Sequence, residues 1–340
     1  MEVQNSLPLA PFTTFHIGGP AQLYIEAFSE EEIRDALAHA HASGLPVFIL
    51  GAGSNVLIPD AGVAGVVLRV MLRDITINAL GKDVFLIAGA GAPWDTVVTV
   101  AGAEGLFGIE NLAGIPGTMG GAAVQNIGAY GAEFSNVFAY ADGIDRETGD
   151  AWRVTGTDAQ FAYRSSFFKT HPEFIITRVA LRLSKSAPLS LAYADLIRAR
   201  EQGVVLTTPR AVAHAVRAIR AQKFPLLSKE GTAGSFFKNP IISQEHAARL
   251  IQKFPNLPVF PQDTGAMKVS LAWILDHVLA LKGYEKGRVR LYEQQPLVLV
   301  ARTGATAHDV TALADEISER VFSATNISIE REVEIFGERR

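Results

Sequence analysis

Cysteine is absent from this chain of 340 residues. Its absence excludes disulfide bonds, thiolate nucleophiles, cysteine-ligated zinc and cysteine-bound iron–sulfur clusters. A metal site built on histidine is disfavoured as well, because no two of the 8 histidines stand four residues apart. We therefore expect no metal, and a reducing compartment suits the chain.

An excess of basic residues is lacking too. Lys and Arg number 31 against 35 Asp and Glu, which gives a formal net charge of −4 and argues against a nucleic-acid partner. The longest apolar runs are interrupted by Arg69, Asp276 and Arg302, so none reaches the ~20 residues of a membrane span. The amino-terminal residues show no signal-peptide pattern. We expect a cytoplasmic protein with no membrane partner.

What the sequence does contain is glycine, concentrated in one segment. Nine of the 30 glycines lie within residues 102–131, where Glu104 and Glu110 are the only charged residues. Main-chain N–H groups in glycine turns can hold a diphosphate without a cation, because glycine lets the chain approach a ligand closely. The alternative is a loop that only needs turns.

Two shorter glycine turns each follow a predicted buried strand. They are residues 51–55, after a strand over 46–50, and residues 89–93, after a strand over 84–88. Neither fits the G-x-G-x-x-G dinucleotide fingerprint, because Val56 and Trp94 stand where the third glycine belongs. A Rossmann dehydrogenase is therefore disfavoured. The three turns together are suited to one extended ligand.

Helical and strand patterns alternate irregularly, which predicts an α+β fold. The chain is about twice as long as a typical domain of ~150 residues, so two or three packed units are expected. Helices are predicted over 30–43, 93–103, 209–222, 243–253, 270–281 and 306–322, and strands over 46–50, 63–70, 83–88, 137–146, 151–155, 174–183, 235–242, 296–302 and 327–336.

Three polar positions are candidates for chemistry. Ser235 lies in a glycine-containing segment but has no neighbouring base, so a serine bonded within a turn is the alternative. Glu330, Glu332 and Glu334 would share one face of the last predicted strand, about 7 Å apart, which favours a proton on Glu332; a solvated polar face is the alternative. Arg164 stands among aromatic residues in the sequence. It could bind a carboxylate of a ligand, and the alternative is an exposed charge on an amphipathic segment.

Several segments appear in the order of a known family. They are Thr14–Gly19, Gly51–Asn55, Gly114–Gly117, Gln125–Gly131, Tyr163–Arg164 with Phe168–Lys169, and Ala233–Pro240. In these segments the chain resembles the UDP-N-acetylenolpyruvoylglucosamine reductases of bacterial cell-wall synthesis. Tyr193, in Leu191–Leu196, is similar to the tyrosine loop of that family's first subtype.

The resemblance implies a two-subdomain FAD-binding fold of the vanillyl-alcohol-oxidase (PCMH) type plus a carboxyl-terminal α+β substrate domain. The implied boundaries are 1–70 and 71–222 for the FAD-binding subdomains, with the PCMH-type region at about 13–184, and 223–322 for the substrate domain; the segment 323–340 is expected to return to the first subdomain.

The resemblance also implies an activity. NADPH would reduce a noncovalently bound FAD, which would then reduce UDP-N-acetylglucosamine enolpyruvate to UDP-N-acetylmuramate. This oxidoreductase reaction serves peptidoglycan synthesis, and with it cell-wall biogenesis, cell shape and division. The implied partner is the small sugar-nucleotide substrate, and the protein is expected to be a monomer.

Residue roles follow from the same resemblance. The implied catalytic residues are Ser235 as proton donor, Glu332 and Arg164. The implied cofactor-binding residues are Gly51, Gly53, Ser54, Asn55, Gly114, Ile115, Pro116, Gly117, Gln125, Asn126, Gly128, Ala129 and Arg220. The implied substrate-binding residues are Tyr163, Tyr193, Lys223, Asn239 and Gln295.

The chain departs from the family pattern at three positions. Arg331 occupies the slot of a usual proline, Glu334 that of a usual arginine, and Phe260 that of a usual tyrosine. Two other functions remain open: a flavoprotein oxidase of the same fold, and a protein that binds flavin or sugar nucleotide without turnover.

Overall fold

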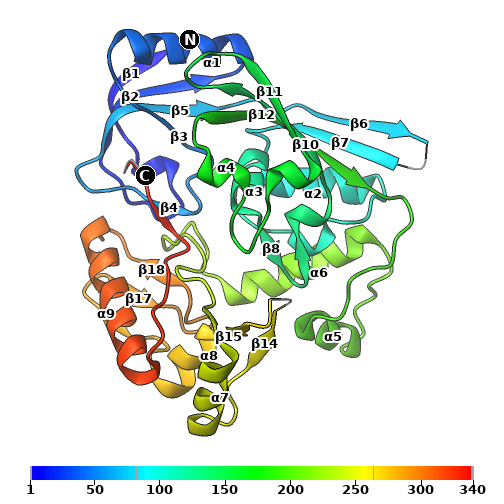
Figure 1. The fold of residues 1–340 in the computed structure, drawn as a ribbon, viewed down its shortest axis with the longest axis vertical. Coiled ribbons are helices and arrows are strands. Elements are labelled where there is room, and N and C mark those ends of the chain that lie inside the picture. Colours follow the sequence, from blue (N-terminus) through cyan, green and yellow to red (C-terminus); the bar gives the residue numbers. More distant parts are fainter. Residues whose placement is uncertain (1, 82, 263, 338–340) are drawn as a thin grey trace. The chain divides into compact units, whose positions relative to one another are not determined.

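The structure is a computed structural model that describes residues 2–81, 83–262 and 264–337. The chain divides into two compact units (Figure 1). Unit 1 comprises Met1–Leu7, Pro20–Ala52 and Val63–Ala221, and unit 2 comprises Pro8–Gly19, Gly53–Gly62 and Gln222–Arg340. Each unit has an apolar core of its own.

A four-stranded sheet opens unit 1, in the order β1-β2-β5-β3. Its strands are β1 (Val3–Pro8), β2 (Pro20–Ala27), β3 (Val47–Ile49) and β5 (Val63–Val70). The strands β2 and β3 pair with β5 in parallel. Helix α1 (Glu30–Ala42) begins at Ser29, whose side chain accepts a hydrogen bond from the Glu32 N–H, as a helix N-cap does. It contacts β2 and β5.

A five-stranded antiparallel sheet forms the rest of the unit 1 framework, in the order β11-β10-β12-β7-β6. Its strands are β6 (Ile75–Leu80), β7 (Asp83–Gly89), β10 (Phe138–Asp145), β11 (Ala151–Thr155) and β12 (Phe174–Leu183). Helix α3 (Met119–Gln125) contacts β7 and β12. The turns that leave β7 and enter α3 are therefore anchored to the same sheet.

The remaining elements of unit 1 are short, apart from three helices. They are α2 (Trp94–Ala103), η2 (Glu110–Leu112), β8 (Gly128–Ala129), β9 (Ala132–Glu133), η3 (Phe134–Asn136), η4 (Gly156–Ala159), α4 (Phe167–Thr170), α5 (Ala194–Glu201) and α6 (Pro209–Lys223). Helix α6 starts at Pro209, which suits a helix start because its missing N–H is not needed there.

The described part of unit 2 is built from small sheets and five helical elements. Its elements are η1 (Ala10–Phe12), β4 (Val56–Leu57), β13 (Ile241–Ile242), α7 (Gln244–Lys253), β14 (Val259–Pro261), β15 (Met267–Val269), α8 (Leu271–Trp273), the π-helical η5 (Ile274–Val278), β16 (Glu285–Lys286), β17 (Val289–Leu291), β18 (Leu299–Ala301), α9 (Ala307–Thr325) and β19 (Glu334–Ile335). Helix α9 packs on β17, and β19 pairs in parallel with β4.

Five of the six predicted helices are where the sequence predicts them. The expected helices over 30–43, 93–103, 209–222, 243–253 and 306–322 are confirmed as α1, α2, α6, α7 and α9. The helix expected over 270–281 is wrong in detail, because only three residues are α-helical before a π-helical turn and Ala280 adopts a left-handed φ of 50°.

The two strands expected around the catalytic candidates are also wrong in detail. Over 235–242 the structure has bridges at Ser235 and Phe237 and then the short β13, and over 327–336 only β19 is regular. The glutamates at 330, 332 and 334 therefore do not share the face of one continuous strand. Residues 338–340 of the segment expected to return to residues 1–70 lie outside the described residues.

We predict that Gly143→Ala destabilises the protein. Gly143 lies at a register shift in β10, and a Cβ there would be 2.2 Å from Trp152 Cζ2 and 2.3 Å from the Ile175 carbonyl oxygen. Overpacking of this kind costs about 1–3 kcal/mol. Urea unfolding measures it, with Gly121→Ala in α3 as the control, because a Cβ there meets nothing closer than 3.4 Å. Equal stability of the two variants would contradict the packing.

Candidate active site

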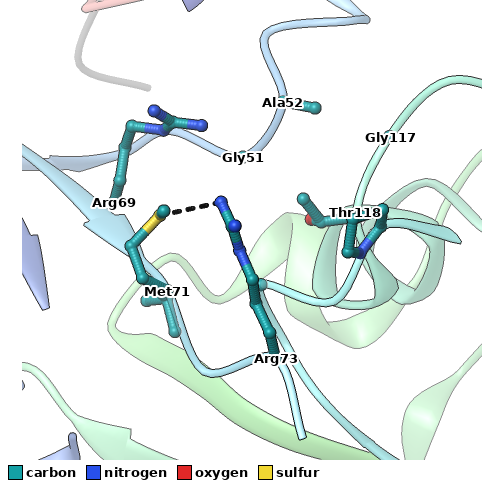
Figure 2. A pocket seen from close by; sticks show the side chains of 10 residues that line it. Gly51, Ala52, Arg69, Met71, Arg73, Gly117 and Thr118 are labelled. Atoms are coloured by element: carbon teal, nitrogen blue, oxygen red, sulfur yellow. Dashed lines mark hydrogen bonds between the residues drawn. The ribbon is translucent and has the colours of Figure 1, made fainter. Parts of the chain in front are cut away.

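A pocket of about 110 Å³ lies within unit 1 where three glycine turns meet (Figure 2). Its lining residues are Gly51, Ala52, Arg69, Val70, Met71, Arg73, Gly91, Pro93, Gly117 and Thr118. One glycine comes from each of the three turns singled out in the sequence. A Cβ at Gly51 would lie 3.2 Å from Thr118 Oγ1, so a side chain there would narrow the space between two turns.

Main-chain hydrogen bonds join the second and third turns. The Met119 N–H donates to the Ala92 carbonyl and the Gly120 N–H to the Ala90 carbonyl, each at 2.9 Å. The Trp94 N–H donates to the Gly117 carbonyl at 3.1 Å. Such bonds need two backbones in close approach, which explains why both turns are built of glycine and alanine. These two turns therefore contribute closely spaced main chain to the pocket wall.

Two arginines supply positive charge to this pocket. Arg69 donates to Tyr24 Oη and to Glu26 Oε1, both at 3.0 Å, which orients its guanidinium. Arg73 is exposed, and its Nη2 lies 3.8 Å from Met71 Sδ. Figure 2 shows its guanidinium extending between Met71 and the Gly117–Thr118 turn. The pocket thus combines close main-chain approach with cations, a combination suited to an anionic ligand.

The turn from Gly114 to Gly117 leads into this pocket wall. The Gly114 carbonyl accepts a hydrogen bond from Arg220 Nε at 3.0 Å. Arg220 also bonds the Tyr130 side chain, and burial lowers the pKa of its guanidinium, against the raising effects of Tyr130 and Asp95. Arg220 therefore contacts the predicted cofactor turn from α6. Ile115 packs partly buried against the unit 1 core.

Arg164 lies in a second cluster of unit 1, with several predicted cofactor residues. It has a left-handed φ of 55°, a strained conformation for a residue with a side chain. Its Nη2 donates to the Gly128 carbonyl at 2.8 Å, and its own carbonyl accepts from Lys169 Nζ at 3.3 Å. Its guanidinium carbon lies 5.4 Å from the centre of the Tyr163 ring. These contacts fix both ends of the residue.

Hydrogen bonds from neighbouring residues connect the segment around Arg164 to the carboxyl-terminal end of helix α3. Lys169 Nζ also donates to Gln125 Oε1 at 2.9 Å, and Asn126 Nδ2 donates to the Ala162 carbonyl at 3.0 Å. Gly128 and Ala129 form β8 and pair with β9. The structure thus brings Arg164 together with the predicted residues Gln125, Asn126 and Gly128.

Two tyrosines of unit 1 contact each other edge to face. The ring centres of Tyr130 and Tyr193 are 5.0 Å apart. Tyr130 is buried with a left-handed φ of 49°, and Asn111 Nδ2 donates to its carbonyl at 2.8 Å. Tyr193 is 45 % exposed and precedes α5. Burial raises the pKa of Tyr193 and raises that of Tyr130 to about 12.

Ser235 and Glu332 lie on adjacent segments of unit 2. Ser235 forms an isolated β-bridge with Val298. The carbonyl of the next residue, Phe236, accepts a hydrogen bond from the Glu332 N–H at 2.8 Å. Asn55 joins them, because its Nδ2 donates to the Glu332 carbonyl at 3.1 Å. Ser235 and Glu332 are both half-buried. The structure therefore brings these two catalytic candidates together, with a predicted cofactor residue beside them.

The flanking polar candidates of unit 2 hold their segments in place. Asn239 Oδ1 accepts a hydrogen bond from the Leu271 N–H at 3.0 Å. The first residue of α8 therefore orients the side-chain amide of Asn239. Gln295 lies in a turn that is closed by a hydrogen bond from the Val298 N–H to the Gln295 carbonyl at 3.0 Å. Val298 is the residue that is bridged to Ser235. Lys223 ends α6.

The candidates are thus distributed over both units. Unit 1 carries Gly51, Gly114, Ile115, Pro116, Gly117, Gln125, Asn126, Gly128, Ala129, Tyr163, Arg164, Tyr193 and Arg220, and unit 2 carries Gly53, Ser54, Asn55, Lys223, Ser235, Asn239, Gln295 and Glu332. Among the residues that sequence reasoning missed, Arg73 and Tyr130 line or support these sites. Tyr130 lies in a segment that carries the family resemblance, whereas Arg73 had no signal in its spacing.

Comparison with known proteins first defines the class. Residues 21–155 match the model of an FAD binding domain, and residues 225–336 match the carboxyl-terminal domain of UDP-N-acetylenolpyruvoylglucosamine reductase. The chain is an FAD-dependent oxidoreductase with the PCMH-type fold and an additional carboxyl-terminal domain, which confirms the predicted α+β fold class. None of the described helices has the length and apolar composition that crossing a membrane requires.

Full-length relatives then define the family. The chain is 39 % identical to the UDP-N-acetylenolpyruvoylglucosamine reductase of Pseudomonas aeruginosa over 99 % of both chains, and 39 % identical to that of Escherichia coli over 97 % of this chain and 95 % of the relative. The crystal structure of the Thermus caldophilus reductase superposes with a TM-score of 0.68 at 25 % identity, covering 98 % of this chain and 99 % of that one. The chain belongs to the UDP-N-acetylenolpyruvoylglucosamine reductase family.

The raised pKa of Tyr130 predicts an alkaline loss of stability. Folding holds its pKa at about 12 against 10.0 when exposed, so the unfolded chain loses this proton first as pH rises. The stabilisation is complete below pH 10 and declines between about 10 and 12. Denaturant unfolding of wild type and Tyr130→Phe at several pH values measures it. A gap between the two that does not shrink above pH 10 would show that Tyr130 ionises normally.

Proposed function

We propose that this chain catalyses the NADPH-dependent reduction of UDP-N-acetylglucosamine enolpyruvate to UDP-N-acetylmuramate. Its membership of the reductase family over nearly its whole length carries this proposal. The product is a precursor of peptidoglycan, so the enzyme serves cell-wall biogenesis. We further propose that it acts in the cytoplasm, as a monomer, with the subdomain boundaries at about residues 70 and 222 and a substrate domain over 223–322.

The residues of unit 1 fit an FAD. When bound, FAD would supply the hydride chemistry that links NADPH to the enolpyruvyl group. The pocket at Gly51, Gly91 and Gly117 offers main-chain walls and the Arg73 guanidinium, which suit the diphosphate of a dinucleotide. We assign Gly53, Ser54, Asn55, Ile115, Pro116, Gln125, Asn126, Gly128 and Ala129 to the same cofactor, and Arg220 to the flavin ring.

We assign Arg164 to the carboxylate of the enolpyruvyl group. When hydride adds to the methylene carbon, negative charge develops on the neighbouring carbon and spreads to that carboxylate. A guanidinium held in place stabilises this charge without reorganising. Its bond to the Gly128 carbonyl and the Lys169 bond to its own carbonyl support such a fixed position.

We assign Ser235 to the proton-transfer step and Glu332 to the substrate carboxylate. Ser235 Oγ would give its proton to the carbon that bears the carboxylate, which completes the addition of hydride and proton across the double bond. Glu332, neutral or sharing a proton, would assist at the carboxylate that Arg164 binds. The main-chain bond from the Glu332 N–H to the Phe236 carbonyl holds its segment beside that of Ser235. Because Asn55 Nδ2 donates to the main-chain carbonyl of Glu332, the backbone that carries this residue is held in place despite the irregular strand.

We assign the sugar and diphosphate of the substrate to five side chains, Tyr163, Tyr193, Lys223, Asn239 and Gln295. Asn239 is oriented by the Leu271 N–H on its oxygen, which directs the amide nitrogen to donate. Tyr193 is exposed enough to contact a ligand while its ring rests on Tyr130.

The function predicts a yellow protein. FAD should be released from the purified protein by denaturation, and NADPH should be consumed much faster with the enolpyruvyl sugar nucleotide than with oxygen. Absorbance of flavin and of NADPH measures both. A colourless protein that binds no FAD would overturn the proposal. Equal or faster consumption with oxygen would assign it to the oxidases, and flavin without turnover to the binding proteins.

Ser235→Ala is predicted to separate the two half-reactions. NADPH should still bleach the flavin at the wild-type rate, because this step needs no proton from Ser235. Reoxidation by the enolpyruvyl substrate should slow by at least about 10²-fold, the usual worth of a positioned proton donor. Anaerobic stopped-flow absorbance follows each step, with Ser323→Ala on the exposed side of α9 as control. Unchanged reoxidation would remove Ser235 from the role.

A further inference from the structure

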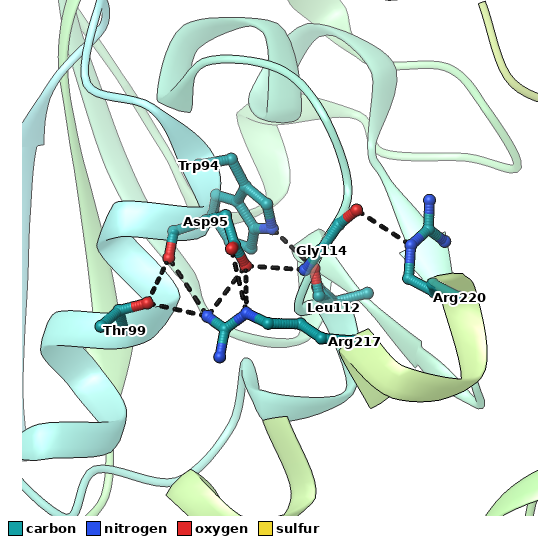
Figure 3. A network of polar contacts seen from close by, with 7 residues as sticks. All are labelled: Trp94, Asp95, Thr99, Leu112, Gly114, Arg217 and Arg220. Carbon is teal, nitrogen blue, oxygen red and sulfur yellow. Dashed lines mark hydrogen bonds and ion pairs between the residues drawn. The ribbon is translucent and has the colours of Figure 1, made fainter. Parts of the chain in front are cut away.

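The peptide groups of Gly114 are held on both sides by charged side chains (Figure 3). Its N–H donates to Asp95 Oδ1 at 2.7 Å, and its carbonyl accepts from Arg220 Nε at 3.0 Å. Gly114 has a left-handed φ of 70°, and a Cβ would lie 3.3 Å from both Arg217 Cγ and Arg220 Cδ. This residue begins the turn that ends at Gly117 in the pocket wall.

Asp95 is held in turn by Arg217. The Arg217 Nε lies 3.0 Å from Asp95 Oδ1 and 2.9 Å from Oδ2, and its Nη2 donates to the Asp95 carbonyl at 3.3 Å. The same Nη2 donates to Thr99 Oγ1 at 2.8 Å, one turn further along α2. Figure 3 shows Arg217 lying along α2 with Asp95 between it and Gly114. One rotamer of the carboxylate is therefore selected.

Helix α6 reaches Gly114 by two routes. Arg217 and Arg220 are three residues apart on α6, so they project from the same face. Arg217 acts on the Gly114 N–H through Asp95, whereas Arg220 binds the carbonyl directly. The start of α2 and the end of α6 thus clamp a single glycine residue. A glycine turn without such contacts would sample many conformations, because glycine is the least restricted residue.

The ion pair contributes little to stability where it stands. The Asp95 and Arg217 side chains remain 44 % and 31 % exposed, and exposed pairs are weak stabilisers. The hydrogen bond from Gly114 to a carboxylate is different, because charged acceptors make stronger hydrogen bonds than neutral ones. The network is therefore poorly suited to holding the fold and well suited to holding one turn.

We propose that Asp95 is a positioning residue for the cofactor. It fixes the Gly114–Gly117 turn in the conformation in which the turn meets FAD, and Arg217 holds Asp95 in the required rotamer. The inference rests on the proposed function, since it takes FAD as the ligand of this turn. It adds two residues, one from α2 and one from α6, that do not touch the reacting atoms.

The test is the affinity of FAD-free protein for FAD, measured by quenching of flavin fluorescence. Asp95→Asn should raise the dissociation constant for FAD about tenfold or more, which is the loss of affinity expected when a hydrogen bond to a charged group is removed. The urea midpoint of the FAD-free protein should stay at the wild-type value, and kcat at saturating FAD should remain near wild type. A fall in affinity matched by an equal fall in stability would overturn the positioning role.

Arg217 variants keep the proposal testable if Asp95→Asn does not fold. Arg217→Met should weaken FAD binding, and the double variant with Asp95→Asn should be no weaker than Asp95→Asn alone, because both act through one carboxylate. Arg217→Lys, which keeps the charge, should recover part of the affinity. Additive losses in the double variant would contradict the linkage.

The matched control is Asp142→Asn, which breaks the two-bond ion pair of Asp142 with Arg153 in the same unit, away from the turn. Its affinity for FAD should equal that of wild type. An equal loss in Asp142→Asn and Asp95→Asn would overturn the inference. If wild-type protein fails to bind FAD, the proposed function fails as well, whereas normal binding by both wild type and Asp95→Asn leaves the function standing and removes only Asp95.

Discussion

The close approach of two glycine turns is the constraint on which the rest of the cofactor site depends. Three main-chain hydrogen bonds join residues 90–94 to residues 117–120, and a Cβ added at Gly120 would lie only 3.0 Å from the Ala90 Cβ. This arrangement forms a pocket wall of peptide groups, and it fixes where Gly114 and helix α3 must lie. The charged residues around it, Asp95, Arg217 and Arg220, act on a frame that the glycines set.

Sequence patterns predict the elements whose signals are local. Helices α1 and α9 begin after Ser29 and Thr306, whose side chains cap them, and such a cap is a short-range hydrogen bond that the local sequence specifies. The segments around Ser235 and Glu332 were predicted as regular strands because alternation was the only signal. In the structure each segment bonds to several partners, including Asn55 and Leu297, and such long-range pairing leaves no period in the sequence.

In the candidate site, too, the features with a local sequence signal could be predicted and those that depend on long-range contacts could not. The meeting of three glycine turns was predictable, since all three carry the same residue types and the first two each follow a strand. The arginines of the pocket were not, because Arg69 and Arg73 lie at the end of β5 and beyond it, outside the glycine segment. Lys169 and Tyr130 lie in segments that resemble the family, but their contacts to Arg164 and Arg220 depend on residues with left-handed backbone conformations, which only the folded chain reveals.

The proposed binding of FAD by the peptide groups of the glycine turns underlies the other residue roles. Hydrogen–deuterium exchange of FAD-free and FAD-loaded protein tests this claim most directly, because it reports on main-chain amides. FAD should slow exchange in peptides that cover residues 89–93 and 114–121, with little change in β6 or α9. Slowed exchange confined to other segments, or none in these two, would contradict the account.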